Sequence, residues 1–266
     1  MMGVTHATSG AAAWIAVTGA APLITTGLVP LSPIGVLAGT AVCAGAALLP
    51  DADHRSATIA HSVPILGRLA AGAVETVSGG HRHGAHSIIA VVLATVAAWG
   101  LSTAMVEVPR YGPLAIGAGL GTAALVCFGL KARDFVESWA TAWVVGLLLG
   151  SFIVLAAPDE VRWFPLAVGL GMLMHLAGDF LTTGGLPGFL WPWVPRPPKP
   201  WRRIPVLNDL WRPNGYVALP LLGDAGSLRE HVLGWALGLY CLAGAIGEVL
   251  LALGVDPVEV LTAFAG

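Results

Sequence analysis

The chain has 266 residues, of which 56% are hydrophobic and only 11% charged, and its formal net charge at pH 7 is −2. Soluble domains carry about 25% charged residues, so this composition excludes an ordinary soluble protein and leaves no place for a separate soluble domain. We predict one integral membrane domain over residues 1–266, surrounded by membrane lipid, and no binding of nucleic acid.

The N-terminal stretch MMGVTHATSGAAAWIAV has no basic residue ahead of its apolar run. A cleaved secretory signal begins with a basic segment, so we expect His6 to stay in the mature protein. The three cysteines, Cys43, Cys127 and Cys241, each lie alone in an apolar run. This spacing favours packing over a disulfide framework or a thiolate zinc site.

Apolar runs close to the ~20 residues needed to cross a bilayer recur along the chain. They predict an all-α polytopic bundle of about seven spans, at about residues 8–28, 34–49, 87–107, 113–131, 139–157, 163–181 and 232–254. The segment at about 182–231, rich in proline and tryptophan, is predicted to be a loop at the membrane interface, because tryptophan favours the headgroup zone.

The predicted spans sort the loops onto two sides of the membrane, and the basic residues are unequally divided between them. One side receives Arg55, Arg68, Arg82, Lys131, Arg133, Arg196, Lys199, Arg202, Arg203, Arg212 and Arg229. The other side receives Arg110 and Arg162. Positive charge near span ends marks the cytoplasmic side, so we expect the first side, with the N-terminus, to be cytoplasmic.

All eight histidines fall on that same side or in the last turns of a span that leads to it. They are His6, His54, His61, His81, His83, His86, His175 and His231, and the acids Asp51, Asp53, Asp179 and Glu230 accompany them. His175 and Asp179 are four residues apart and share a helix face. Imidazole and carboxylate groups at several helix ends are the ligands of zinc, manganese or iron hydrolases, so we predict a metal site at the cytoplasmic end.

Plainer interpretations stay open for single residues. An isolated histidine such as His61 or His83 is typical of an interfacial anchor. The pair His175 and Asp179 could be a buried hydrogen-bonded pair without a metal. The convergence of four separate segments is what favours a metal site.

The motifs LPDADH at 49–54, HRHGAHS at 81–87, HLAGDFLTTGG at 175–185 and GSLRE at 226–230, together with His6, resemble the YdjM/YbcI-like family of inner-membrane-associated metal-dependent hydrolases. The resemblance covers nearly the whole chain and implies a multi-pass protein of a bacterial-type inner (plasma) membrane. By position it marks as candidate metal ligands His6, Asp51, Asp53, His54, His81, His86, His175, Asp179 and Glu230. The family's third motif carries a threonine where Ala85 stands here, and His83 is the candidate substitute for its hydrogen bond.

A distant kinship of the family with zinc-dependent phospholipase C and related nucleases implies two or three zinc ions and a phosphate-ester substrate, with manganese or iron as other ions. Nine candidate ligands also exceed what one tetrahedral zinc takes. Asp53 or Glu230 is the expected general base. Arg82 is expected to bind a phosphate oxygen or, equally, to act as a positive-inside anchor.

These observations predict a membrane-embedded metal-dependent hydrolase of a phosphate ester, with a lipid as the expected substrate. Two alternatives belong to other classes: a non-catalytic membrane partner of a cytoplasmic regulator with a structural metal, and a metal transporter. A transporter holds its ligands near the bilayer midplane, whereas the centres of these spans are apolar. The sequence does not specify the oligomeric state.

Overall fold

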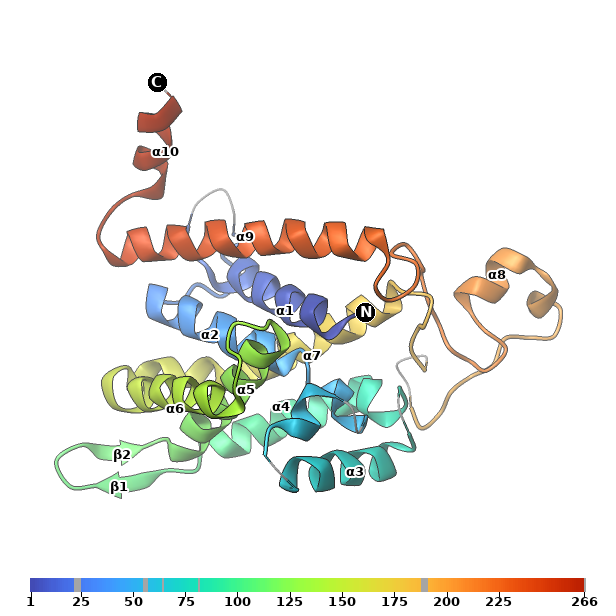
Figure 1. Cartoon of the computed structure of the whole chain (residues 1–266), viewed down its shortest axis with the longest axis horizontal. Helices are drawn as coiled ribbons and strands as arrows, with labels where there is room; N and C mark the ends of the chain where they lie inside the picture. The colour runs from blue at the N-terminus through green and yellow to red at the C-terminus, as the bar shows by residue number, and fades with distance from the viewer. Residues whose placement is uncertain (22–24, 55–56, 64, 81, 188–190, 266) are drawn as a thin grey trace.

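The computed structural model describes the chain except for residues 22–24, 55–56, 64, 81, 188–190 and 266, and it is mostly helical (Figure 1). The α-helices are α1 Gly3–Thr18, α2 Pro33–Ala46, α3 Leu66–Ser78, α4 Ile88–Ser102, α5 Ile116–Ala132, α6 Trp139–Ala156, α7 Phe164–Phe180, α8 Pro205–Leu210, α9 Leu228–Ala252 and α10 Pro257–Ala265. Short 3-10 turns are η1 Pro50–Asp53, η2 Thr58–His61, η3 Gly84–His86, η4 Pro158–Trp163 and η5 Trp201–Arg203. Strands β1 Val106–Val108 and β2 Gly112–Leu114 form an antiparallel hairpin.

Each of the seven predicted spans contains a helix, but the helices differ in length. In the part of the chain that the structure describes, three helical stretches are long and apolar enough to cross a membrane: Pro33–Asp53, Trp139–Ala156 and Leu228–Ala252. Helices α4, α5 and α7 are apolar but shorter. The structure therefore supports a helical membrane protein with three candidate spans, and the count of seven stays a prediction.

Two sequence-based boundaries are wrong. The first predicted span, 8–28, extends too far, because α1 ends at Thr18 and the chain leaves the helix at Gly19. The backbone N–H groups of Ala20 and Ala21 instead donate to the buried Glu248 carboxylate on α9, at 2.8 and 3.1 Å. The Glu248 carboxylate thus takes the place of the backbone carbonyls that would accept these N–H groups in a helix.

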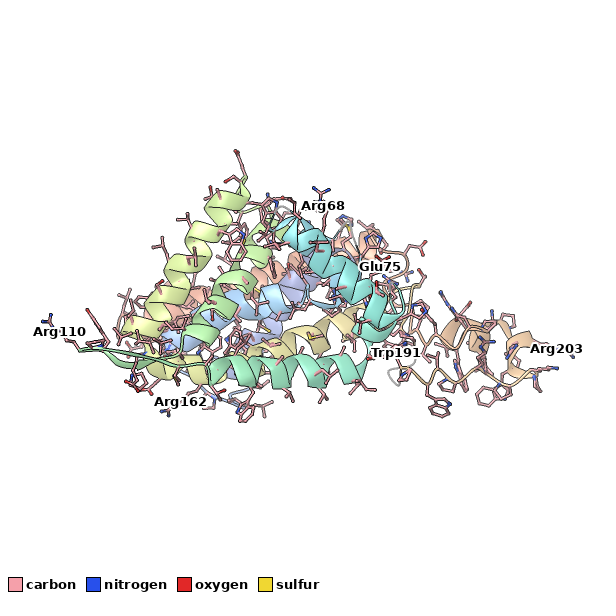
Figure 2. All side chains as sticks on the ribbon, turned by 90° about the horizontal axis from the view of Figure 1, so that it is seen from below. Arg68, Glu75, Arg110, Arg162, Trp191 and Arg203 are labelled. Carbon is pink, nitrogen blue, oxygen red and sulfur yellow. The ribbon has the colours of Figure 1, made fainter. Side chains whose placement is uncertain are left out.

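The connection between the predicted spans 34–49 and 87–107 also contains regular structure, including the 13-residue helix α3. Its small residues Gly67 and Ala71 are buried against the protein, whereas the larger Leu69 and Val77 are exposed. The apolar side of α3 therefore points outward. Figure 2 shows α3 with Arg68 and Glu75 along it, and places Arg110 and Arg162 at the end of the molecule away from Arg203.

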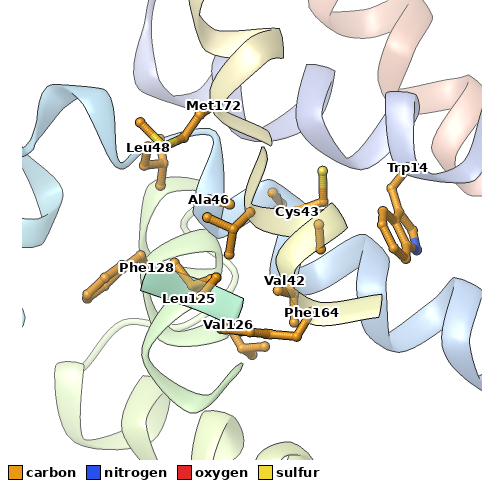
Figure 3. Close-up of a cluster of buried hydrophobic side chains, with 14 of the residues drawn as sticks. Trp14, Val42, Cys43, Ala46, Leu48, Leu125, Val126, Phe128, Phe164 and Met172 are labelled. Atoms are coloured by element: carbon orange, nitrogen blue, oxygen red, sulfur yellow. The ribbon is translucent and has the colours of Figure 1, made fainter. Parts of the chain in front are cut away.

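Helix α2 lies at the centre of the bundle, and its backbone is approached closely from two sides. A Cβ built on Gly10 of α1 or on Gly171 of α7 would lie 2.6 Å from the carbonyl oxygen of Cys43. Small residues of this kind allow helix backbones to come together where lipid surrounds the protein. Figure 3 shows the adjoining core, in which Trp14, Val42 and Phe164 come from three different helices.

This packing decides where the candidate ligands lie. Gly10 is one helical turn from His6, and Gly171 is one turn from His175. Because both glycines contact the same turn of α2, α1 and α7 are held with these histidines at the same end of the bundle. The α2 chain then leaves its helix at Ala46 and continues directly into η1, which carries Asp51 and Asp53.

Candidate metal centre

The candidate ligands converge from four segments that are far apart in the sequence. Among the described residues, two groups of side chains could each hold a metal ion: Asp51, His86 and His175 form one, and His6, His175 and Asp179 form the other. The ligand atoms of each group lie within 4.8 Å of one another. The histidines of both groups are buried, so the site is enclosed by α1, η1, η3 and α7.

The first group has the spacing of a three-ligand metal site. His86 Nε2 lies 3.2 Å from His175 Nε2 and 3.6 Å from Asp51 Oδ1, and His175 Nε2 lies 3.7 Å from the same oxygen. Two ligands at about 2.0–2.1 Å from a tetrahedral zinc are about 3.3–3.4 Å apart. Three donors at such separations fit one face of a tetrahedron and do not themselves fill its fourth position.

Hydrogen bonds to the Nδ1 atoms of His175 and His86 orient both rings so that their Nε2 atoms face the donor triangle. His175 Nδ1 lies 2.7 Å from the carbonyl oxygen of Ala47, and since a carbonyl can only accept, Nδ1 carries the proton and Nε2 presents its lone pair. His86 Nδ1 lies 3.2 Å from Asp53 Oδ2. A carboxylate or carbonyl on the second ring nitrogen is typical of metal-binding histidines.

Asp179 connects the first group to His6. Its Oδ2 lies 3.6 Å from the Nε2 atoms of both His86 and His175, and its Oδ1 lies 3.3 Å from His6 Nε2. The α-amine of Met1 also donates to Oδ1, at 2.5 Å. The His6 ring stacks on that of His175, with centroids 3.7 Å apart. His6 Nδ1 is buried and has no hydrogen-bond partner among the described residues.

The electrostatics around His86 favour a cation at its ring. Burial alone would lower the pKa of His86, but hydrogen bonds with Asp51 and Asp53, together with the charges of Asp53 and Asp179, raise it to about 9. The ring is therefore protonated at neutral pH in the metal-free protein. A metal that binds Nε2 takes the place of that proton.

The centre is least enclosed on the side of Asp51 and Arg82, whose side chains are 28% and 22% exposed. Arg82 Nη2 lies 3.3 Å from Asp179 Oδ1. Its backbone is left-handed, with φ 58°, and its N–H donates to Asp53 Oδ2 at 3.0 Å. A non-glycine residue held in this region is uncommon and often marks a functional site.

Tyr216, from the proline- and tryptophan-rich loop, holds the backbone of Arg82 in place. Its hydroxyl donates to the Arg82 carbonyl at 3.0 Å and lies 3.5 Å from His83 Nδ1. Burial raises the pKa of Tyr216, so the hydroxyl keeps its proton and its role as a donor. His83 therefore lies beside the centre, against Tyr216, and outside both groups of potential ligands.

The sequence model of the YdjM inner membrane protein family matches residues 1–251 of the chain. The protein belongs to this family. Searches of curated proteins and of solved structures find no match. Family membership and the apolar helices together assign the protein to a membrane.

Three candidate ligands of this YdjM-family protein lie outside the two donor groups. His54 is exposed. The Glu230 carboxylate accepts the N–H groups of Met2 and Gly226, at 2.6 and 2.8 Å, and so ties the start of α1 to α9. Asp53 lies behind His86, where it accepts from the ring and from the Arg82 backbone. His81 lies outside the described residues.

Sequence reasoning missed the groups that orient the ligands. The carbonyl of Ala47 leaves no signal in the sequence, because every residue has one. Tyr216 could have been noticed as a lone tyrosine in the loop, but nothing in its spacing connects it to Arg82. The candidate residues that the sequence did name are thus supported by one backbone group and one distant side chain.

The Asp53→Asn variant tests the orienting role of this carboxylate. An amide cannot accept with the strength of a carboxylate from the His86 ring, and loss of such an orienting partner typically lowers metal affinity about 10–100-fold. We expect a loss of this size when the protein competes with a chelator for zinc. Asp134→Asn is the control, because Asp134 is exposed and its left-handed backbone, φ 53°, suits asparagine. Equal affinity of Asp53→Asn and wild type would contradict the assignment.

Proposed function

We propose that this YdjM-family protein is a metal-dependent hydrolase of phosphate esters that acts on a lipid at the membrane surface. The observation that carries the proposal is the triangle of donor atoms from Asp51, His86 and His175, with sides of 3.2, 3.6 and 3.7 Å. Three protein ligands with an open fourth position are typical of catalytic zinc sites, whereas structural sites use four.

Zinc suits the donor set, because it accepts both imidazole nitrogen and carboxylate oxygen in a tetrahedral arrangement. Bound in this position, zinc supplies Lewis acidity towards a phosphoryl oxygen and a water whose pKa is near 7. A second ion would draw on His6 and the Oδ1 atom of Asp179, which points away from the first group. Asp179 would then belong to the second position through Oδ1, and the first would keep its three ligands, Asp51, His86 and His175.

The surrounding residues have separate roles in this proposal. Asp53 and the Ala47 carbonyl orient His86 and His175. Glu230 holds the N-terminal segment that presents His6. Because hydrogen bonds to ring or backbone N–H groups already engage Asp53 and Glu230, we assign both to positioning instead of the general-base role expected from the sequence.

Arg82 is the residue that we assign to the substrate. Its guanidinium is the cation at the less enclosed side of the centre, beside Asp179. Gly184 faces this guanidinium, and a side chain there would collide with it. Arginine binds phosphate through two parallel N–H groups, so Arg82 can hold a phosphoryl oxygen next to the donor triangle.

Helix α3 supports a lipid as the substrate. It packs on η1 and η3, the turns that carry Asp51, Asp53 and His86. Its outward side chains include Leu69 and Val77, which are 64% and 79% exposed. At 1.5 Å per residue a 13-residue helix is about 20 Å long, too short to cross a bilayer and suited to lie in its interface.

The loop at 182–231 adds a second interfacial element. Trp193 and Trp201 are exposed there, and Arg202 and Arg203 follow Trp201 in the chain. Exposed tryptophans prefer the headgroup region, and cations attract anionic lipid. With the basic residues on this side, we propose that the centre lies at the cytoplasmic face of the membrane, where a lipid headgroup can reach Arg82.

The test is hydrolysis by the purified, zinc-loaded protein in lipid nanodiscs, measured as phosphate or headgroup released from a panel of phospholipids. We expect activity that a chelator removes and zinc restores. Arg82→Lys is expected to lower kcat/KM about 100-fold, with unchanged zinc content, because lysine cannot make the two parallel contacts.

Arg203→Lys is the matched control, since Arg203 lies on the far loop (Figure 2) and is exposed. Zinc bound without hydrolysis of any phospholipid in the panel would overturn the proposed activity and favour a structural metal. Equal activity of Arg82→Lys and wild type would remove Arg82 from the substrate site.

A further inference from the structure

Two adjoining cavities lie between α1, α2, α5 and α9, on the side of α1 that carries Thr5 and Thr8. The outer one has a volume of about 400 Å³ and the inner one about 350 Å³. Thr8, Arg133, Gly238 and Leu242 line both, so the two spaces are neighbours, and we refer to them together as the groove. Each volume is within the range of pockets that bind small molecules, about 300–1,000 Å³.

The polar groups of the groove gather at one end. Thr5, Arg133 and His231 line the outer cavity. The inner cavity continues deeper along all four helices, to Ala11 on α1, Leu37 on α2, Val126 on α5 and Ala245 on α9. Along α1, α5 and α9 the lining therefore changes from polar to apolar in the same direction, whereas α2 lines only the inner cavity. The polar end is the end that holds the metal centre, because Thr5 is next to His6 and His231 is next to Glu230.

Arg133 stands at the junction of the two cavities. It is half-buried, at the end of α5, and its guanidinium lies 5.3 Å from the centroid of the Phe135 ring. Within the described residues it forms no ion pair with a carboxylate. A half-buried cation that none of the described carboxylates pairs with, above an apolar slot, is complementary to an anion that carries a hydrocarbon chain.

We propose that this groove binds one phospholipid with an anionic headgroup, with its phosphate on Arg133 and an acyl chain in the inner cavity. Phospholipids have the same order of parts as the groove, with the charge at the membrane surface and the hydrocarbon towards the bilayer centre. The hydroxyls of Thr5 and Thr8 and the ring of His231 supply further hydrogen-bonding groups at the outer end. The lipid would fill the space between α9 and α5.

This site is separate from the proposed hydrolytic centre and needs only that the protein lies in a membrane. The test therefore reads binding and neither metal content nor hydrolysis. Purified protein is equilibrated in detergent with an equimolar mixture of phosphatidylglycerol and phosphatidylcholine. The lipids that remain bound are then counted by native mass spectrometry.

We expect wild type to retain one phosphatidylglycerol in preference to phosphatidylcholine. Arg133→Gln is expected to lower that preference about tenfold, with Arg203→Gln as a control that removes an equal charge elsewhere. Gly238→Leu is expected to reduce the retention of both lipids, because Gly238 lines both cavities and a Cβ there meets no atom within 4 Å. Gly100→Leu, on α4 and equally open, is its control.

An unchanged lipid preference in Arg133→Gln would overturn the anionic site. Unchanged retention in Gly238→Leu would show that the cavity does not hold the acyl chain. A wild-type dimer that Gly238→Leu dissociates would show that a second copy of the chain covers the groove, which also overturns the proposal. Both glycine variants place leucine in an open helical position, so a folding defect would appear in both.

Discussion

His175→Asn is expected to prevent the purified protein from holding zinc, the ion that we propose for this centre. His175 belongs to both donor groups, and its Nε2 lies within 3.7 Å of donor atoms on Asp51, Asp179 and His86. Loss of a ligand should exceed the 10–100-fold loss of affinity typical of removing an orienting partner. Metal content, measured by inductively coupled plasma mass spectrometry after dialysis, should therefore fall to less than about a tenth of the wild-type value.

Asparagine is the informative replacement because its side-chain N–H can still donate to the Ala47 carbonyl, as His175 Nδ1 does. The variant loses the ligand atom while the hydrogen bond between α7 and the end of α2 is kept. His61→Ala is the control, since His61 is exposed. Wild-type zinc content in His175→Asn would mean that the buried histidines form a hydrogen-bonded cluster that does not bind the ion.

The site could be predicted from the sequence to the level of the segments that meet. The spacing of His175 and Asp179 places both on one face of α7, and His175 Nε2 lies 3.6 Å from Asp179 Oδ2. The spacing could not predict that Asp51 and Asp53 of the LPDADH motif have different roles. The 3-10 turn η1 directs Asp51 towards the donor triangle and Asp53 behind His86. Without knowledge of that turn, the sequence does not indicate which of the two carboxylates faces the triangle.

The fold was predictable where structure depends on local hydrophobicity, and less so elsewhere. Long apolar runs located helices such as α6 and α9 to within a few residues. The end of α1 depends on Glu248, more than 200 residues away. Helix α3 escaped detection because its buried side consists of small residues such as Gly67 and Ala71, and its larger apolar side faces outward.

Gly171→Leu is expected to disrupt both the bundle and the candidate metal centre. A Cβ at Gly171 would lie 2.6 Å from the Cys43 carbonyl oxygen and 2.8 Å from the Ala47 nitrogen. These atoms belong to the α2 backbone and cannot turn aside as a flexible side chain would, so α7 must move away from α2. Overpacking of this kind costs about 1–3 kcal/mol, and we expect a loss of stability at the upper end of that range.

The displacement should reach the ligands, because His175 is one turn from Gly171 and bonds to the carbonyl of the same Ala47. We therefore expect Gly171→Leu to lower the temperature of thermal unfolding in detergent and to reduce zinc content together. Gly100→Leu makes the same change in α4 where a Cβ meets no atom within 4 Å, and it should alter neither quantity. If Gly171→Leu lost stability but kept full zinc content, the close approach of α7 to α2 would stabilise the fold without positioning the ligands.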